Sequence, residues 1–263
     1  MPSSRNASPI SPSSEGETTL AHPAAALVHK LVLAPLLVAQ AIATRRRALV
    51  LPEAEGPRHG RTDAVAGTPL RLLVAGDSSA AGVGVARQED AVMGHLLRAL
   101  QRHLDRPIAW SLRAKSGLTT RGIQRLLEAE PPGPVDIAVV ISGVNDVVDQ
   151  VGAGRAVRHR AALADWLLTS GLAHHVVYAP LPPIHRFPLL PEPLRHVLGG
   201  DARRHDQALA RWAATRRDVS HAAFEIDLNR ETMASDGFHP GEPVYRACGE
   251  GLADHVASVL ARG

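Results

Sequence analysis

The sequence predicts an α/β fold in which a five-stranded parallel sheet is covered by helices on both faces. From residue 70 onward, short apolar runs alternate with longer amphipathic stretches, as strands and helices do in such folds. The length of 263 residues suits one sizeable domain with an appendage, and a composition of 45% hydrophobic and 21% charged residues is ordinary for a chain that buries a core. These observations exclude a collagen and a chain that is disordered throughout.

The predicted strands are five apolar runs, at residues 70–75, 108–114, 135–141, 174–179 and 222–227. The predicted helices are five amphipathic stretches, near residues 91–103, 120–130, 155–170, 201–217 and 243–261. Because a helical stretch separates each strand from the next, every connection is a crossover and the strands run parallel. Ligands bind beyond the carboxyl ends of the strands in such sheets, so we expect functional residues in the segments that follow the strands.

The chain before the sheet divides into three segments by composition. Residues 1–20 are rich in Ser, Pro and Thr and are expected to be a disordered tail. Residues 21–47 are nearly all apolar up to three consecutive arginines, and are expected to form an apolar helix with a basic flank. Residues 48–69 contain Pro, Gly and charges, which indicates a linker to the domain at residues 70–263.

The apolar segment has three interpretations. Residues 24–43 are about as long as a helix that spans a bilayer, although polar residues and a proline interrupt them. One alternative is a helix packed on the domain; another is a secretory signal ending at Ala39-Gln40-Ala41, in which case the protein is exported. We favour a cytoplasmic protein that associates with a membrane through residues 24–47, with Arg45–Arg47 near anionic head groups.

Composition also limits the partners and cofactors. The net charge of +3 arises in residues 1–61, whereas residues 62–263 hold 22 charges of each sign, so the main body lacks the basic face that a nucleic-acid partner requires. Aromatic residues are only 3% of the chain, too few for a base-stacking platform. The single Cys248 forms no internal disulfide, and no Cys/His spacing typical of a zinc site occurs, so we expect neither a metal nor a cofactor.

The first predicted strand runs directly into Gly76-Asp77-Ser78-Ser79. A serine in this position exposes its hydroxyl where the following backbone N–H groups can face an oxyanion, so Ser78 is a candidate nucleophile. Asp, Ser and Gly are also the residues that turns and helix N-caps prefer, and for this segment alone a plain turn is an equal alternative.

Two further segments follow predicted strands. Gly117, in Ser116-Gly117-Leu118-Thr119, would let a backbone N–H approach a ligand, although for this segment alone a plain strand-to-helix turn is the better explanation. Asn145, in Ser142-Gly143-Val144-Asn145-Asp146, places a primary amide at the mouth of a central strand, where its N–H can reach an oxyanion. The alternative for this segment is a helix cap, a role that suits Asp146.

The fourth segment, Asp236-Gly237-Phe238-His239-Pro240, precedes the last predicted helix. Asp236 and His239 are three residues apart, so the carboxylate can accept a hydrogen bond from Nδ1–H and leave Nε2 free as a general base. The chain has 14 histidines, and a single Asp–His pair is often only structural.

Together the four segments supply a nucleophile, a base, its partner and three oxyanion donors. GDSS at 76–79, the glycine at 117, GVND at 143–146 and DGFHP at 236–240 resemble, in order, the four signature blocks of the SGNH (GDSL-type) hydrolase family. The resemblance covers roughly residues 70–262. Because the first block reads GDSSAAG rather than the fuller GDSL, the sequence is most similar to the lysophospholipase-like branch.

This resemblance implies a flavodoxin-like three-layer α/β/α fold and the hydrolysis of a carboxylic ester through an acyl-enzyme intermediate. Ser78 is then the nucleophile, His239 the general base and Asp236 its partner. The N–H groups of Ser78 and Gly117 and the side-chain amide of Asn145 form the oxyanion hole.

The expected substrate is a small-molecule ester, such as a lipid or an acetylated sugar. An acyltransferase with the same triad and a non-catalytic binding protein on the same fold are the alternatives, and the complete set of blocks favours the esterase. The Pro- and Leu-rich residues 180–200 are either a lid over the site or a packed surface loop.

Overall fold

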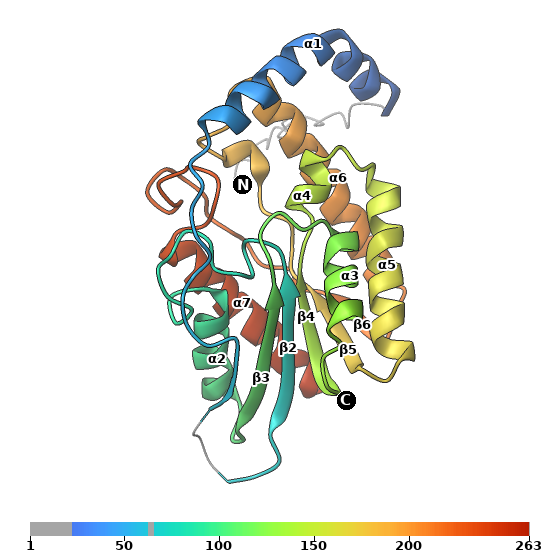
Figure 1. The fold of residues 1–263 in the computed structure, drawn as a ribbon. Coiled ribbons are helices and arrows are strands. Elements are labelled where there is room, and N and C mark those ends of the chain that lie inside the picture. The colour runs from blue at the N-terminus through green and yellow to red at the C-terminus, as the bar shows by residue number, and fades with distance from the viewer. Residues whose placement is uncertain (1–22, 63–65, 263) are drawn as a thin grey trace, which may run out of the picture.

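The computed structural model describes residues 23–62 and 66–262, so the expected disordered tail at residues 1–20 lies outside the described residues. Within them, six strands form one sheet in the order β1-β3-β2-β4-β5-β6 (Figure 1). The strands are β1 (His59–Arg61), β2 (Leu70–Gly76), β3 (Ile108–Ala114), β4 (Val135–Ile141), β5 (Ala173–Tyr178) and β6 (Val219–His221). Strands β2 to β6 run parallel, and β1 pairs antiparallel with β3 at the edge.

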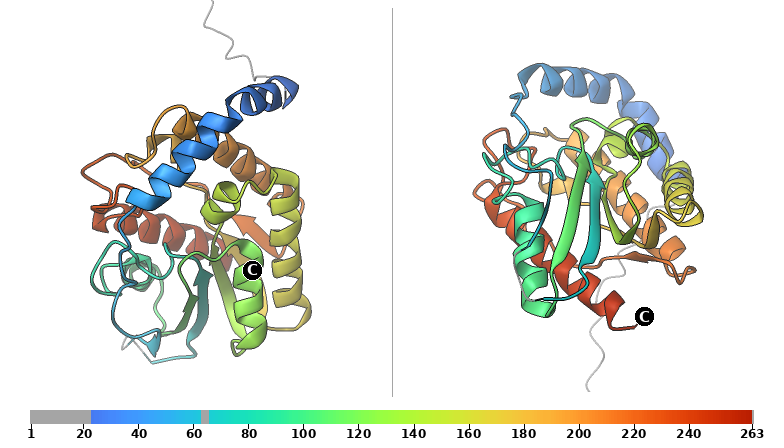
Figure 2. Two further views of the ribbon diagram at one scale, coloured as in Figure 1. Left: turned by 45° about the horizontal axis from the view of Figure 1, so that its top comes forward. Right: turned by 60° about the horizontal axis from the view of Figure 1, so that its bottom comes forward.

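Helices cover both faces of the sheet, as the sequence predicts (Figures 1 and 2). They are α1 (Pro23–Arg47), α2 (Val92–His103), α3 (Thr120–Ala129), α4 (Val144–Val148), α5 (Ala153–Thr169), α6 (Leu194–Ala213), α7 (Glu242–Leu260) and the 3-10 turn η1 (Ile184–Arg186). Helices α2 and α7 pack on one face, and α3, α5 and α6 pack on the other. Alternate residues of β2 serve the two layers, Leu72 and Val74 on the α2 and α7 side and Leu73 and Ala75 on the opposite side.

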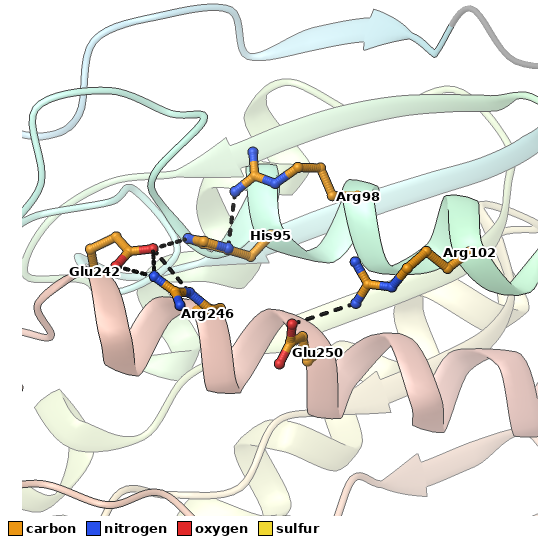
Figure 3. A network of polar contacts seen from close by, with 6 residues as sticks. All are labelled: His95, Arg98, Arg102, Glu242, Arg246 and Glu250. Carbon is orange, nitrogen blue, oxygen red and sulfur yellow. Dashed lines mark hydrogen bonds and ion pairs between the residues drawn. The ribbon is translucent and has the colours of Figure 1, made fainter.

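Helices α2 and α7 approach each other closely. A Cβ added at Gly249 of α7 would lie 2.5 Å from the Cβ of His95 on α2, so only glycine permits this separation. Side chains of both helices form a polar network along the seam (Figure 3), made by His95, Arg98, Arg102, Glu242, Arg246 and Glu250. The contact fixes the first turn of α7, which comes directly after the predicted Asp236 and His239.

One predicted strand is misplaced. Residues 222–227 form no strand, and β6 lies three residues earlier, where Val219 pairs with Val176 of β5. The alternating apolar residues Phe224, Ile226 and Leu228, which suggest a strand in the sequence, line a pocket instead. These apolar residues therefore alternate with polar ones because they form one wall of a pocket, and not because they lie on one face of a sheet.

The expected linker at residues 48–69 is attached to the sheet. It contributes β1, which makes the sheet six-stranded and mixed rather than five-stranded and parallel. Ala54 is buried, and Glu55 forms a bridge with Arg87 beyond the carboxyl end of β2. The segment therefore packs alongside the domain that follows it.

Helix α1 lies across the end of the molecule where the carboxyl ends of the strands emerge (Figures 1 and 2), and it contacts α6. None of the helices in the described part of the chain has the length and apolarity needed to cross a membrane.

Candidate active site

Ser78, His239 and Asp236 form one hydrogen-bonded chain at the carboxyl edge of the sheet. Ser78 follows β2, and its Oγ lies 3.0 Å from Nε2 of His239. Nδ1 of His239 lies 2.5 Å from Oδ2 of Asp236. Ser78 and His239 are 161 residues apart in the sequence, and they meet because the fold places the end of β2 next to the segment before α7. The geometry suits a serine whose proton can pass to an oriented imidazole.

The local turn that holds His239 is built on Asp236. Its Oδ1 accepts hydrogen bonds from the backbone N–H groups of Phe238 and His239, both at 2.9 Å. Gly237 has φ of +64°, a conformation that disfavours other residues, and a Cβ there would come within 3.1 Å of the backbone nitrogen of Leu189. Both oxygens of the carboxylate are therefore engaged, one in shaping the turn and one in orienting the imidazole.

Asp236 is held in its charged form. Burial alone would raise the pKa of its carboxyl, but the hydrogen bonds from the His239 side chain and from the two backbone N–H groups outweigh burial, and the pKa is lowered. A carboxylate here favours the tautomer of His239 that is protonated on Nδ1, which leaves Nε2 able to accept the serine proton.

Gly117 lies in the loop before α3 and Asn145 in the first turn of α4, and the structure ties these two segments together. Nδ2 of Asn145 donates to the carbonyl of Leu118 at 2.9 Å. Gly117 has φ of +79°, and no atom lies within 4 Å of where its Cβ would stand, so the backbone faces open space. Next to it, the Ser116 N–H donates to Oε1 of Glu53 at 2.7 Å, which anchors this loop to the segment expected to be a linker.

Asp146 caps a helix, as its position in the sequence suggests, but the helix is α3 rather than α4. Its Oδ2 accepts from the backbone N–H of Thr120 at 3.1 Å and from the Thr120 hydroxyl at 2.6 Å. Both residues are fully buried. Since Asn145 contacts Leu118 and Asp146 contacts Thr120, two adjacent residues of α4 hold the segment at the start of α3 in place.

A buried arginine that the sequence analysis did not single out lies next to the residues that join β4 to α4. Arg160 of α5 is fully buried, and its Nη2 donates to the carbonyl of Ser142 at 3.4 Å. A Cβ at Gly143 would stand 2.2 Å from the same nitrogen, and Gly143 has φ of +129°. Burial lowers the pKa of Arg160, while the nearby Asp146 opposes this shift. No local pattern marks this arginine, because its burial is produced by the packing of α5.

Asp77, beside the serine, is also buried and was not singled out as a functional residue. Its Oδ1 accepts from the Ser79 N–H at 3.0 Å, which shapes the turn after β2. Burial raises the pKa of this carboxyl from 3.8 to about 7, while the Ser79 hydrogen bond and the charge of His239 limit the rise. A carboxyl that titrates near neutral pH therefore lies next to Ser78.

An apolar cavity of about 70 Å³ opens beside Ser78 and His239. Its wall is mostly hydrophobic and includes Phe187, Phe224, Met233, Phe238, Tyr245 and Cys248. Burial raises the pKa of the Cys248 thiol to about 12, so this cysteine is an apolar wall residue at neutral pH. A larger and more open hollow of about 680 Å³ lies at the opposite edge of the sheet, near His174 and Arg216, and contains none of the predicted site residues.

Residues 180–200 contribute to the cavity wall as a packed segment. Pro180, Pro182 and Phe187 line the cavity, and Ile184 and Leu190 are buried in the core. The segment includes η1 and the first residues of α6. Of the two alternatives for residues 180–200, this packing therefore favours the packed loop over the lid.

Comparison with known proteins shows the family to which the chain belongs. The model of the GDSL-like Lipase/Acylhydrolase family matches residues 74–247. The GDSL-like esterase Rv1075c of Mycobacterium tuberculosis is 29% identical over 184 residues, which are 67% of this chain and 58% of that protein; the chain therefore spans less than two thirds of the length of this curated relative.

Solved structures share the fold at low identity. The lipase Lip_vut3 from a goat rumen metagenome is 17% identical with a TM-score of 0.59, over 72% of this chain and 98% of that one. Est24, a carbohydrate acetylesterase from Sinorhizobium meliloti, is 17% identical with a TM-score of 0.52, over 72% of this chain and 99% of that one. The α/β/α fold, the order of the sequence blocks and the match over residues 74–247 agree, and the chain belongs to the GDSL-like lipase/acylhydrolase family of hydrolases.

Proposed function

We propose that the protein is a serine esterase that hydrolyses a carboxylic ester through an acyl-enzyme intermediate. The observation that carries the proposal is the chain from Asp236 through His239 to the Ser78 hydroxyl, with contacts of 2.5 and 3.0 Å, at the mouth of an apolar cavity. The order of the four sequence blocks supports the same assignment.

In the proposed mechanism, Oγ of Ser78 attacks the ester carbonyl carbon while Nε2 of His239 takes the hydroxyl proton. The carbonyl oxygen becomes an oxyanion, which accepts hydrogen bonds from the N–H groups of Ser78 and Gly117 and from the Asn145 amide. Collapse of the tetrahedral intermediate breaks the bond to the alcohol oxygen, and His239 returns the proton to that oxygen. His239 then takes a proton from water as the water oxygen attacks the acyl-serine carbonyl. It returns this proton to Oγ of Ser78 as the bond between the acyl group and Oγ breaks and the acid leaves.

The cavity favours a short acyl group. Its volume of about 70 Å³ and its mostly hydrophobic wall suit a few carbon atoms rather than a long chain. Acetyl esters of sugars and other short esters are therefore the preferred substrates. The GDSSAAG form of the first block supports placement in the lysophospholipase-like branch, for which a lipid ester is the second substrate class to test.

The decisive experiment compares wild type with Ser78→Ala. We expect wild type to react with a fluorophosphonate probe and to hydrolyse p-nitrophenyl acetate, and the variant to do neither while retaining its thermal unfolding transition. Probe labelling without hydrolysis, but with acyl transfer to an added alcohol, would establish the acyltransferase instead. If wild type neither reacts with the probe nor hydrolyses the ester, the non-catalytic binding protein becomes the preferred interpretation. Rates across acyl chain lengths should fall as the chain grows beyond the cavity.

The pH dependence tests the role of His239. A protonated imidazole cannot accept the serine proton, so kcat/KM should fall toward acid pH. Asp236 remains charged over this range because its pKa is lowered, so protonation of Asp236 does not explain the loss. Because the pKa of Asp77 is raised to about 7, the profile is compared with that of Asp77→Asn, which should show the same fall if His239 is the base. A rate that stays constant from neutral to acid pH, measured with p-nitrophenyl acetate while chemistry limits turnover, would remove His239 as the base.

A further inference from the structure

Exposed apolar side chains are concentrated at one end of the molecule. Among the residues whose side chains the structure describes, seven of the eight large hydrophobic side chains that are exposed lie between residues 31 and 50. They are Leu31, Val32, Leu36, Val38, Ile42, Leu49 and Val50, and the eighth is Val148 of α4. Helices α1 and α4 both lie toward the carboxyl edge of the sheet, the edge that holds Ser78 (Figure 1).

One face of helix α1 contacts the rest of the protein, and these contacts determine which face of the helix points outward. The Gln40 side chain forms two hydrogen bonds at the start of α6, donating to the carbonyl of Glu192 at 2.6 Å and accepting from the Leu194 N–H at 3.1 Å. Leu37, on the same face, packs against the core. The inner face is therefore occupied by the protein, and only the outer face is available to a partner.

The outer face is an apolar stripe that ends in positive charge. Leu31, Pro35, Val38, Ile42 and Arg45 are all exposed and are separated by four, three, four and three residues, a spacing that places them on one side of a helix. Val38 is 58% exposed and Ile42 49% exposed, unusual values for large apolar side chains in water. At 1.5 Å per residue the stripe is about 21 Å long.

The charges of α1 are all of one sign in the described helix. Arg45, Arg46 and Arg47 fill its last turn and are exposed, and no acidic residue occurs between residues 23 and 47. No ion pair between described residues involves these three arginines. An apolar stripe with adjacent unpaired guanidinium groups complements a lipid surface, where acyl chains lie below negatively charged phosphates.

We infer that the outer face of α1, residues 31–47, docks on the surface of an anionic lipid bilayer, with the helix lying in the plane of the interface. This inference is independent of the proposed esterase chemistry. It has a consequence for the site, because the loop that holds Gln40 at Glu192 and Leu194 also supplies Phe187 to the cavity wall. Docking through α1 would therefore turn the carboxyl edge of the sheet toward the membrane.

The test is sedimentation of the full-length protein with vesicles made of equal parts phosphatidylglycerol and phosphatidylcholine, and with vesicles of phosphatidylcholine alone. Wild type should bind the anionic vesicles. Val38→Glu with Ile42→Glu should abolish binding, because both charges would enter the acyl boundary. Replacing Arg45, Arg46 and Arg47 by Gln should weaken binding about 100-fold, at roughly 1 kcal/mol for each arginine at the surface.

The matched control replaces three exposed arginines outside α1, namely Arg158, Arg211 and Arg217, by Gln, and should bind as wild type does. Equal weakening in this control would attribute binding to net charge and overturn the inference, as would unchanged binding of the double glutamate variant or no binding of wild type. A wild-type dimer that becomes monomeric in the double glutamate variant, seen by light scattering, would assign the stripe to a second copy instead.

Thermal unfolding of every variant shows that it is folded, and hydrolysis of soluble p-nitrophenyl acetate should be the same in all of them. If no variant, nor wild type, hydrolyses the ester while vesicle binding follows the expected order, the docking surface stands and the proposed function fails. The two proposals are therefore separated by the same set of proteins.

Discussion

Replacing Asp77 by Asn should change how the stability of the protein depends on pH. The pKa of this buried carboxyl is about 7 in the folded chain, raised by burial from 3.8, so the unfolded chain releases the proton at lower pH than the folded chain does. The stability that this group contributes is therefore fully present below about pH 3.8 and is lost as the pH rises through about 7. At 1.36 kcal/mol per pH unit, the loss between pH 5 and pH 8 is about 3 kcal/mol.

The Asp77→Asn variant keeps an oxygen that can accept from the Ser79 N–H but carries no titrating group. Urea unfolding of both proteins at pH 5 and pH 8 should show the variant gaining about 3 kcal/mol relative to wild type at the higher pH. Six histidines whose pKa burial lowers are present in both proteins, and their contributions cancel in the comparison. Asp105→Asn, at an exposed carboxyl, controls for the loss of one acid. A stability difference that is the same at both pH values would refute the reasoning.

Three other substitutions test separate parts of the structure. Asn145→Ala should lower kcat about 10²–10³-fold with a much smaller change in KM, and a defect confined to KM in steady-state assays would make Asn145 a binding residue. Tyr245→Phe removes the buried 2.6 Å hydrogen bond from the tyrosine hydroxyl to the Val83 carbonyl, and should lower the free energy of unfolding in urea by about 1–3 kcal/mol. An unchanged free energy of unfolding would show that the carbonyl finds another partner. Gly199→Ala would place a Cβ 2.5 Å from that of His185 and should cost about 1–3 kcal/mol, whereas unchanged stability would mean that the segment before α6 adapts freely.

Two strands of the sheet could be predicted to the residue, because both stand out as runs of apolar residues in the sequence. The runs at 108–114 and 135–141 are the bounds of β3 and β4 in the structure. β4 is mostly buried and, apart from Asp136, apolar, so it is visible as a continuous apolar run. β3 is only partly buried, and the alternation of its apolar residues with Ser111 and Arg113 marks it as a strand instead. By contrast, β1 has only three exposed residues, His59 to Arg61, and joins the sheet through backbone hydrogen bonds to β3, for which no side-chain pattern is required.

The candidate site was predictable where its geometry is local or follows from topology. Asp236 and His239 lie in one turn, and Ser78 follows a central strand, so a parallel sheet brings them to the same edge. The burial of Asp77 and Arg160 was not predictable, because it depends on helices packed from distant parts of the chain. Glu53, which holds the Gly117 loop through Ser116, was missed for a different reason: it lies in a segment whose composition is typical of a linker.

The two layers of the fold have separate parts in the proposed chemistry. His239 reaches Ser78 from the segment before α7, and α7 is positioned by α2 through the close approach at Gly249. The Gly117 loop and the first turn of α4 are joined instead on the α3 and α5 side, by the hydrogen bond from Asn145 to Leu118 and by the Asp146–Thr120 cap. Ser78, at the end of the strand between these layers, is where proton transfer from one side and oxyanion stabilisation from the other would coincide. A shift of one layer relative to the other would therefore impair catalysis even if every proposed catalytic residue remained present.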